Sequence, residues 1–572
     1  MSKYKVNYYK PTDIDLSFLE KQYDKINSET SDENYNPYRI TNIQLYNPLY
    51  KNFFDMKENN YSKIALNHKF HLQDLETIYE KDEKLPISKK SFIKFSPLLD
   101  PYRYMIGKYD IHDKRITTMP KLNSDDTTVD NKLLSYHNAS YIDAFYNYLT
   151  SITLNHHGNK HGMNYYGSYM GVQSKFRVCL TDDVEYLRNS EFFNEHIGKL
   201  FYIEDRGSEL SFNPFLGMES SRRNKTKIHV SESNIEIECD ELTENFETNN
   251  NDHSDIETVY NKSMSNSSTS TDSSSDSEMN YSSSEEDDSE EDDSEEDDSE
   301  EDDEEENDEE EDDESSDCSS EEEELYGYIH NFPIQMICME KCDGTLDELF
   351  AKDEIDEKIG ASILFQIVMI LLLYQKMFHF THNDLHTNNI MYVDTEEEFL
   401  YYIYDNHSYK VPTYGKIYKI IDFGRAIFTF NGKIYCSDSF SKDGDATTQY
   451  NCEPFMNENR PRLEPNNSFD LCRLGCSLFD FVTDIDENEE DLDELQKTIR
   501  RWCLDDNGKN VLYKKNGEER YPNFKLYKMI ARVVHNHTPE KQLEFPFFNQ
   551  FLTDTVIENS LNIDNLPSYI DK

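Results

Sequence analysis

An α+β fold interrupted by a long acidic insert is the fold class that this 572-residue sequence predicts. Residues 363–380 form an apolar run with the length of a buried helix. Residues 418–421 have the pattern of a strand and lead directly into Asp422-Phe423-Gly424. Residues 207–324 consist instead mainly of Ser, Asn, Thr, Asp and Glu. We therefore expect a folded part on each side of this insert.

The net charge of −58 is concentrated in the insert. Residues 284–324 hold 31 Asp and Glu and no Lys or Arg, and removing these charges leaves −27 for the rest of the chain. Ser-Glu-Glu-Asp-Asp occurs four times in succession over residues 284–303. Such a segment buries too little apolar surface to offset about 1–2 kcal/mol of backbone entropy per ordered residue. We predict that the insert is disordered, and that it either tethers basic proteins or only adds solubility.

Charge, hydropathy and cysteine spacing exclude several classes of protein. Nucleic acid is not an expected partner, because binding its phosphates requires clusters of Lys and Arg. No membrane contact is expected, because the longest apolar run, residues 363–373, contains Gln366 and is shorter than the ~20 residues of a membrane span. The N-terminus is polar and predicts no secretory leader. The ten cysteines form no C-x-x-C pair, so buried thiols of a cytoplasmic protein are expected rather than zinc ligands.

Two regular elements are predicted before the insert. Residues 1–90 are polar and rich in tyrosine, and we expect them to form an N-terminal extension that packs on the part that follows. Residues 91–95 then alternate as a strand, with Lys94 between apolar neighbours. Residues 139–154 predict a helix, because apolar side chains recur at helical spacing at Ile142, Phe145, Tyr146, Leu149 and Ile152. Asp143 on this helix is either the partner of a lysine or a solvated or capping residue.

Glycine is unevenly distributed along the chain. The first glycine is Gly107, and a cluster of glycines then occupies residues 162–171. This cluster fits a loop that covers phosphate groups, with Lys175 behind it, or a strand-turn-strand. We favour the strand-turn-strand, because no helix with an inward-facing acid follows the cluster. No glycine-rich loop precedes Lys94.

The polar residues that follow the apolar run are the strongest functional signal. Residues 382–393 read His-Asn-Asp-Leu-His-Thr-Asn-Asn-Ile-Met-Tyr-Val, and Asp384 lies 38 residues before Asp422. This order resembles the catalytic and metal-binding loops of the protein kinase superfamily, H-x-D-x-x-x-x-N followed by D-F-G. The resemblance extends well over residues 325–572 and weakly over 91–206. In composition the chain is similar to the kinase-like proteins encoded by giant DNA viruses such as mimivirus.

The resemblance implies a bilobal fold with a small β-rich lobe and a large helical lobe. Residues 91–206 would form the first part of the small lobe, and residues 325–572 its last strand, the hinge and the large lobe. The insert at 207–324 would therefore interrupt the small lobe. The hinge backbone from Glu340 to Cys342 would hydrogen-bond the adenine ring of ATP.

The resemblance also implies a role for each polar residue of the site. Asp384 would orient the attacking hydroxyl and accept its proton, while Asn389 and Asp422 would hold Mg²⁺. Lys94 would bind the ATP phosphates, with Asp143 as its partner where the family has glutamate. The shorter side chain of aspartate puts this ion pair at risk.

Three further residues of the large lobe carry predictions. Asp470, at the start of a helix, would hold the backbone of the catalytic loop. His386 replaces the lysine of serine/threonine kinases, and either hydrogen-bonds the transferring phosphoryl group or is a packed ring. Asn383 replaces an arginine that receives the phosphate of the activation segment in many kinases.

The loss of that arginine predicts activity that needs no phosphate on the activation segment. A phosphate there would find no cation at position 383, although Lys433 or Lys442 would be able to supply one. The candidate acceptors of such a phosphate are Ser437, Ser439, Ser441, Thr447 and Thr448.

Three function classes are compatible with these residues. The first is an ATP-dependent serine/threonine protein kinase, with an unidentified protein substrate. The second is a catalytically weak pseudokinase or scaffold that binds basic partners through the insert. The third is a small-molecule kinase, because H-x-D-L-H-x-x-N also occurs in haspin-like kinases and in choline and aminoglycoside phosphotransferases.

Overall fold

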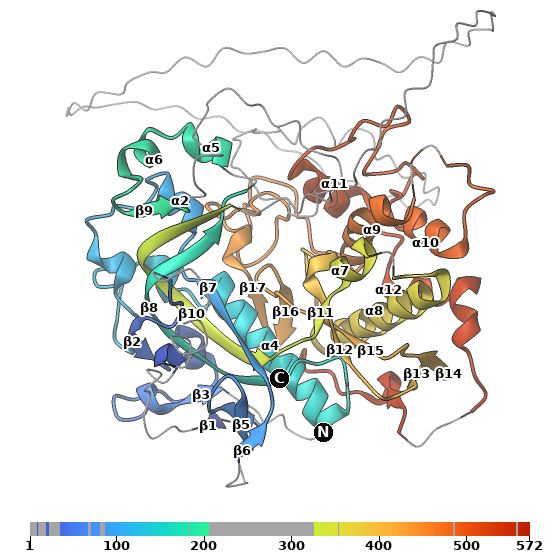
Figure 1. The fold of residues 1–572 in the computed structure, drawn as a ribbon, viewed down its shortest axis with the longest axis horizontal. Helices are drawn as coiled ribbons and strands as arrows, with labels where there is room; N and C mark the ends of the chain where they lie inside the picture. The colour runs from blue at the N-terminus through green and yellow to red at the C-terminus, as the bar shows by residue number, and fades with distance from the viewer. Residues whose placement is uncertain are drawn as a thin grey trace, which may run out of the picture. The chain divides into compact units, whose positions relative to one another are not determined.

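The computed structural model describes residues 8–9, 19–21, 35–66, 70–80, 86–181, 184–204, 325–352, 354–483, 485, 487–555 and 559–571. In these residues the chain is mixed α+β, with several small and mostly antiparallel sheets and a group of helices (Figure 1). The predicted α+β class is therefore confirmed. The predicted disorder of the insert concerns residues that lie outside the described ones.

The largest sheet has five strands in the order β2-β8-β10-β7, with β9 also paired to β10. These strands are β2 (Ile40–Gln44), β7 (Ser91–Pro97), β8 (Tyr165–Cys179), β9 (Phe201–Ile203) and β10 (Tyr326–Glu340). The long strands β8 and β10 run side by side (Figure 1). β7 is the strand predicted around Lys94. β2 comes from the predicted N-terminal extension, and this part of the extension pairs directly with the sheet.

The glycine cluster at residues 162–171 does not form a strand-turn-strand, which corrects the interpretation of the sequence. Residues 165–179 are one strand, because β10 pairs with them along its length. Gly171 allows β2 to approach closely: a Cβ there would lie 2.6 Å from Cγ2 of Ile40 and 2.9 Å from the carbonyl oxygen of Thr41. Gly171 thus serves the packing of two strands, and residues 165–171, as part of β8, do not form a phosphate-covering loop either.

Helix α4 (Ala139–His157) confirms the helix predicted at residues 139–154. The Asn138 side chain caps its first turn by accepting from the N–H of Ser140, and Gly158, with a φ of 73°, ends it. The ring of Tyr146 lies 4.7 Å from the ring of Phe423 in the D-F-G sequence. Helix α4 therefore connects the main sheet to the loop that carries Asp422.

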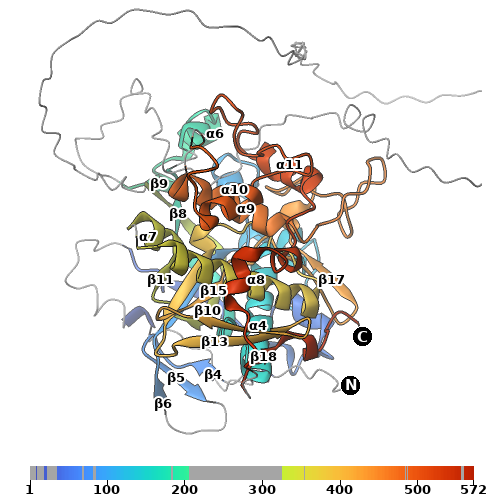
Figure 2. The same cartoon turned by 90° about the vertical axis from the view of Figure 1, so that its right-hand side faces the viewer.

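Helix α8 (Glu357–Phe378) is the buried helix predicted from the apolar run. Among the described residues it is the one helix long and apolar enough to cross a membrane, and 89% of its apolar window is buried inside the fold. Helices α9 and α10 pack on each other (Figure 2). Helices α10 and α12 contact α8. The helices of this part are α7 (Leu346–Ala351), α9 (Phe469–Val482), α10 (Glu494–Trp502), α11 (Lys525–Val533) and α12 (Pro539–Gln542).

Small sheets and short helices complete the described chain. The remaining helices are α2 (Pro101–Met105), α3 (Asn131–Leu134), α5 (Val184–Arg188) and α6 (Glu191–His196). The two sheets before β7 consist of β1 (Tyr8–Tyr9) with β3 (Ala65–Leu66), and of β4 (Phe70–Leu72), β5 (Thr77–Glu80) and β6 (Pro86–Ser88). A further sheet consists of β13 (Phe399–Tyr404), β14 (His407–Pro412) and β18 (Leu561–Asn562), and a hairpin of β16 (Ile427–Phe430) and β17 (Lys433–Cys436).

One small sheet positions the candidate site. It contains β11 (Gly344–Thr345), β12 (Ile390–Asp394) and β15 (Lys416–Ile420). Strands β12 and β15 pair antiparallel with Ile390 opposite Ile420, and the N–H of Ile421 donates to the carbonyl of Asn389. The start of β12 and the end of β15 therefore lie together, so Asn389 and Asp422 meet at one edge of this sheet.

The eight cysteines within the described residues carry free thiols, and seven of them are buried. This agrees with the predicted buried thiols. In the same residues no group of three or more His, Cys, Asp or Glu side chains has the arrangement of a metal site.

Candidate active site

Lys94 joins two carboxylates that come from distant parts of the chain. Its Nζ lies 2.7 Å from Oδ2 of Asp143 on α4 and 2.8 Å from Oδ1 of Asp422 after β15. Burial alone would lower the pKa of Lys94, but these two carboxylates raise it well above its usual value. The structure thus brings together three of the predicted site residues, with Asp143 and Asp422 beside the Lys94 cation.

Asp143 is a buried ion-pair partner rather than a capping or solvated residue. Its side chain is 1% exposed, and Asn138, not Asp143, caps helix α4. Besides Lys94, its carboxylate accepts from Asn147 Nδ2 at 2.9 Å and from the N–H of Phe423 at 3.0 Å. Burial raises the pKa of Asp143, and the Lys94 cation opposes this change. The shorter reach of aspartate therefore does not prevent the pair, because α4 lies close enough to β7.

Lys175, the alternative phosphate lysine, lies elsewhere. It is on β8 opposite His330, and its Nζ lies 5.5 Å from the ring centroid of Tyr202. The described ion pairs that reach Asp143 and Asp422 come from Lys94.

Helix α9 holds the loop that carries Asp384. The carboxylate of Asp470, at the start of this helix, accepts from the N–H groups of His382 and Asn383, each at 2.8 Å. These are the contacts predicted for Asp470. Asn383 has a φ of 65°, a conformation that asparagine tolerates better than most residues. Its side chain donates to the carbonyl of Arg425 and accepts from the hydroxyl of Tyr450, so this position ties the loop to the segment after D-F-G.

Asp384 has one polar partner on each carboxylate oxygen. The hydroxyl of Tyr527 on α11 donates to Oδ1 at 2.7 Å, and Nη1 of Arg425 lies 3.5 Å from Oδ2. Burial by itself raises the pKa of Asp384, but the charges of Arg425 and Arg473 and the Tyr527 hydroxyl hold this pKa well below its usual range. The side chain is 26% exposed, so an anionic carboxylate with one open side faces the solvent.

Asn389 and His386 form a pair whose proton positions follow from their partners. Asn389 Nδ2 donates to the carbonyl of Asp384 at 2.9 Å, which identifies this atom as the amide nitrogen. The same nitrogen lies 3.0 Å from Nε2 of His386, which must accept. Burial lowers the pKa of His386 to about 4, so the ring is neutral and carries its proton on Nδ1. This Nδ1 is buried and has no hydrogen-bond partner among the described residues.

The oxygens of Asn389 and Asp422 suit a small, hard cation. Because its nitrogen is used, Asn389 presents its amide oxygen, and Asp422 is 44% exposed with a pKa held below its usual value by Lys94 against the effect of burial. Mg²⁺ needs only one or two protein carboxylates when it also binds phosphates. The lack of a larger cluster of ligands in the described residues is therefore compatible with a Mg²⁺ site here.

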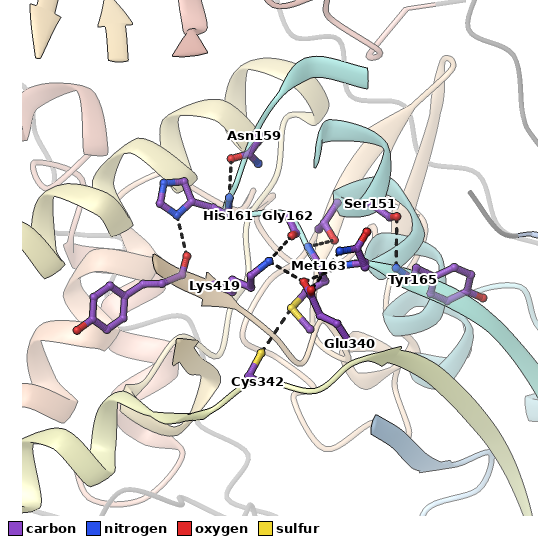
Figure 3. Close-up of polar contacts among 12 residues, drawn as sticks. Ser151, Asn159, His161, Gly162, Met163, Tyr165, Glu340, Cys342 and Lys419 are labelled. Atoms are coloured by element: carbon purple, nitrogen blue, oxygen red, sulfur yellow. Dashed lines mark hydrogen bonds and ion pairs between the residues drawn. The ribbon is translucent and has the colours of Figure 1, made fainter. Parts of the chain in front are cut away.

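The predicted hinge is built around a buried ion pair (Figure 3). Glu340, at the end of β10, lies 2.6 Å from Nζ of Lys419 on β15 and accepts from the N–H and side chain of Asn164. Lys419 also donates to the carbonyl of Gly162 at 2.7 Å. We call these four residues the Glu340 hub. Lys89 adds a longer contact of 3.3 Å from the surface.

Two of the three hinge N–H groups are used within the protein. The N–H of Glu340 donates to Asn164 and that of Lys341 to Lys90. For Cys342 no N–H partner is found among the described residues. Of these three N–H groups, the one of Cys342 is therefore without a partner within the described residues.

Two aspartates fasten the segment after D-F-G. Asp445 lies 2.7 Å from Nη2 of Arg425. Asp438 accepts from the N–H of Ala139 at the start of α4 and lies 2.9 Å from Nζ of Lys132. Position 383 carries no cation, but Arg425 supplies one nearby. The carboxylate of Asp445 in this segment already pairs with it.

Sequence reasoning missed Arg425, Tyr527 and the Glu340 hub. Arg425 directly follows Gly424, so its proximity to the site was visible, but its direction toward Asp384 was not. Tyr527 comes 143 residues after Asp384 and its neighbouring sequence carries no recognisable signal.

Comparison with known proteins gives no independent assignment: no family model and no curated protein matches this chain.

Proposed function

We propose that this protein transfers the γ-phosphoryl group of ATP to a hydroxyl group of a protein. The observation that carries the proposal is the meeting of Lys94, Asp143 and Asp422, which are far apart in the sequence, at distances of 2.7–2.8 Å beside the loop that holds Asp384 and Asn389. A lysine beside two carboxylates suits a nucleotide. The lysine cation can bind the phosphates, and a carboxylate can bind the metal cation that accompanies them. The bilobal kinase-like fold belongs to the same proposal.

Each residue has a task in this reaction. Lys94 binds the phosphates while Asp143 keeps its side chain in place, and the N–H of Cys342 takes the edge of the base. Asn389 and Asp422 would hold Mg²⁺, which neutralises charge on the phosphates when bound. The acceptor oxygen attacks the γ-phosphorus, the bond to the ADP oxygen breaks, and the proton passes to the carboxylate of Asp384.

The low pKa of Asp384 defines its part in the step. A carboxylate that binds protons weakly is a poor base before the reaction, so it mainly orients the hydroxyl and takes the proton late, when the oxygen has bonded to phosphorus. The Nδ1–H of His386 has no partner within the described part of the chain, so we assign it to an oxygen of the transferring group.

The test compares phosphate transfer by wild type and Asp384→Asn, using ³²P-labelled ATP and generic protein acceptors. We expect the variant to lose at least about 10²-fold in rate, the lower end for loss of a proton acceptor. Asp422→Ala should abolish the dependence on Mg²⁺ together with the activity. Asp394→Asn is the matched control, because Asp394 lies on β12 near the loop but its side chain is 67% exposed. Full activity in both site variants, at equal folding, would overturn the assignment.

A scaffold that binds basic partners through the insert is the second candidate. It is favoured by one observation: no glycine precedes Gly107, and the turn between β4 and β5 contains Asp74 and Glu76 rather than glycine. Undetectable ATP binding by wild type would favour this reading. In either case we place the protein in the cytoplasm.

A further inference from the structure

Tyr527 contacts the proposed catalytic aspartate from a distant part of the chain. It lies on helix α11 (Lys525–Val533), and its hydroxyl is 2.7 Å from Oδ1 of Asp384. At this distance, with a carboxylate as acceptor, the hydrogen bond is of the charge-assisted kind, which is shorter and stronger than a neutral one.

The tyrosine approaches Asp384 from inside the protein. Tyr527 is 1% exposed, whereas the Asp384 side chain is 26% exposed. A phosphate acceptor has to arrive from the exposed side, so the tyrosine hydroxyl does not occupy its place. The same burial leaves no room for a phosphoryl group on Tyr527 itself, which argues against this residue being modified by the site.

The ring of Tyr527 is held on several sides. The rings of Phe524 and Phe469 lie 5.3 Å and 6.2 Å from it, and the guanidinium carbons of Arg473 and Arg425 lie 5.1 Å and 5.6 Å from its centroid. Burial raises the pKa of Tyr527, the negative charge of Asp384 adds to this effect, and the pKa is about 12. The hydroxyl therefore remains protonated and donates. A rigid donor of this kind can fix the orientation of its acceptor.

We propose that Tyr527 is a positioning residue for Asp384: its hydrogen bond fixes the rotation of the carboxylate, so that the open side of this group faces the incoming hydroxyl. The last torsion of a carboxylate has only broad minima, and the contact of Oδ2 with Nη1 of Arg425 is long, at 3.5 Å, so the 2.7 Å hydrogen bond from Tyr527 is the shorter of these two restraints. The inference rests on the proposed phosphotransfer, and it adds a residue from α11 to that site. Misorientation of a reacting group slows the chemical step while leaving the binding of ATP nearly unchanged.

The experiment compares wild type, Tyr527→Phe and the matched control Tyr513→Phe. Tyr513 also donates to an aspartate, at 2.8–2.9 Å from the oxygens of Asp480, but this pair is exposed and outside the proposed site. Transfer of ³²P from ATP to dephosphorylated casein and to myelin basic protein gives kcat and KM. A fluorescent ATP analogue counts the binding-competent molecules, so that unfolded protein does not enter kcat.

For Tyr527→Phe we expect kcat to fall about 10-fold, equivalent to about 1.4 kcal/mol in the barrier, with KM for ATP within about two-fold of wild type. Tyr513→Phe should leave both constants unchanged. An unchanged kcat in Tyr527→Phe, or a loss that appears only in KM, overturns the inference while the proposed function stands. If wild type itself transfers no phosphate, the proposed function fails and the inference fails with it.

Discussion

Replacing Lys419 by methionine tests the Glu340 hub most directly (Figure 3). The side chains of Lys419 and Glu340 are 4% and 7% exposed and lie 2.6 Å apart. Removing the cation leaves a carboxylate buried with Asn164 and with Lys89, which is 40% exposed and 3.3 Å away. Breaking a buried pair from one side costs about 3–5 kcal/mol, because the remaining charge loses its compensation. The partly exposed Lys89 offsets little of this, so we expect Lys419→Met to lower the free energy of unfolding by about 3 kcal/mol.

The double variant separates charge from packing. In Lys419→Met with Glu340→Gln no buried charge remains, and the glutamine oxygen can still accept from Asn164. We expect this double variant to lose only about 1 kcal/mol, the cost of one unsatisfied hydrogen bond at Gly162. Each single variant should thus be less stable than the double one, which is a coupling energy measurable in a double-mutant cycle.

Urea unfolding followed by tryptophan fluorescence measures these values. Trp502 is the one tryptophan of the chain and is fully buried on α10, so its emission reports unfolding. Lys514→Met is the matched control, because Lys514 pairs with Glu518 on the surface, with side chains 49% and 66% exposed, and should cost less than about 0.5 kcal/mol. A loss below about 1 kcal/mol in Lys419→Met, or a double variant as unstable as the single ones, would refute the reasoning.

Three further predictions concern pH, regulation and the insert. Lys419 and Lys89 overcome the effect of burial and hold the pKa of Glu340 at about 2, below its ordinary 4.5, so its contribution to stability is complete above about pH 4.5 and is lost as pH falls toward 2. The contribution of Glu340 to the free energy of unfolding amounts to about 3 kcal/mol. Glu340→Gln should remove this contribution from the pH dependence measured by urea unfolding, and the same dependence on pH in the variant would contradict the prediction. Because Asp445 already pairs with Arg425, phosphatase treatment should leave activity unchanged, whereas Asp445→Asn should lower it. A ten-fold loss after phosphatase treatment would show a phosphate switch instead. Deleting residues 245–322 should leave the melting temperature nearly unchanged, since their composition predicts little burial; a fall of many degrees would show that they dock on the folded part.

Local patterns in the sequence were sufficient for several elements. Helices α4 and α8 follow from apolar residues at helical spacing, because burial of one face needs only that spacing. The closeness of Asn389 to Asp422 also follows, because short loops at the ends of two paired strands keep these residues together. The pair of Lys94 and Asp143 was expected only from the resemblance to kinases, and the two side chains lie 2.7 Å apart.

The pairing of β8 with β10 was decided by tertiary structure. These strands are separated in sequence by the insert, and their register depends on contacts that no local pattern contains. The glycines at 162–171 were misread for this reason: Gly171 allows the close approach of β2, which the sequence around it does not encode.

Tertiary structure also decided the electrostatics of the site. The residues that set the charge state of Asp384 come from three elements, the loop after β15, α9 and α11, and the partners of Glu340 come from β15 and from the turn before β8. Arginine, lysine and tyrosine occur throughout any sequence, and their effect on a carboxylate depends on a distance of a few ångströms. The sequence therefore determined which groups are available for chemistry, while folding determined which of them face one another, because electrostatic and hydrogen-bond energies depend on separation in space and not along the chain.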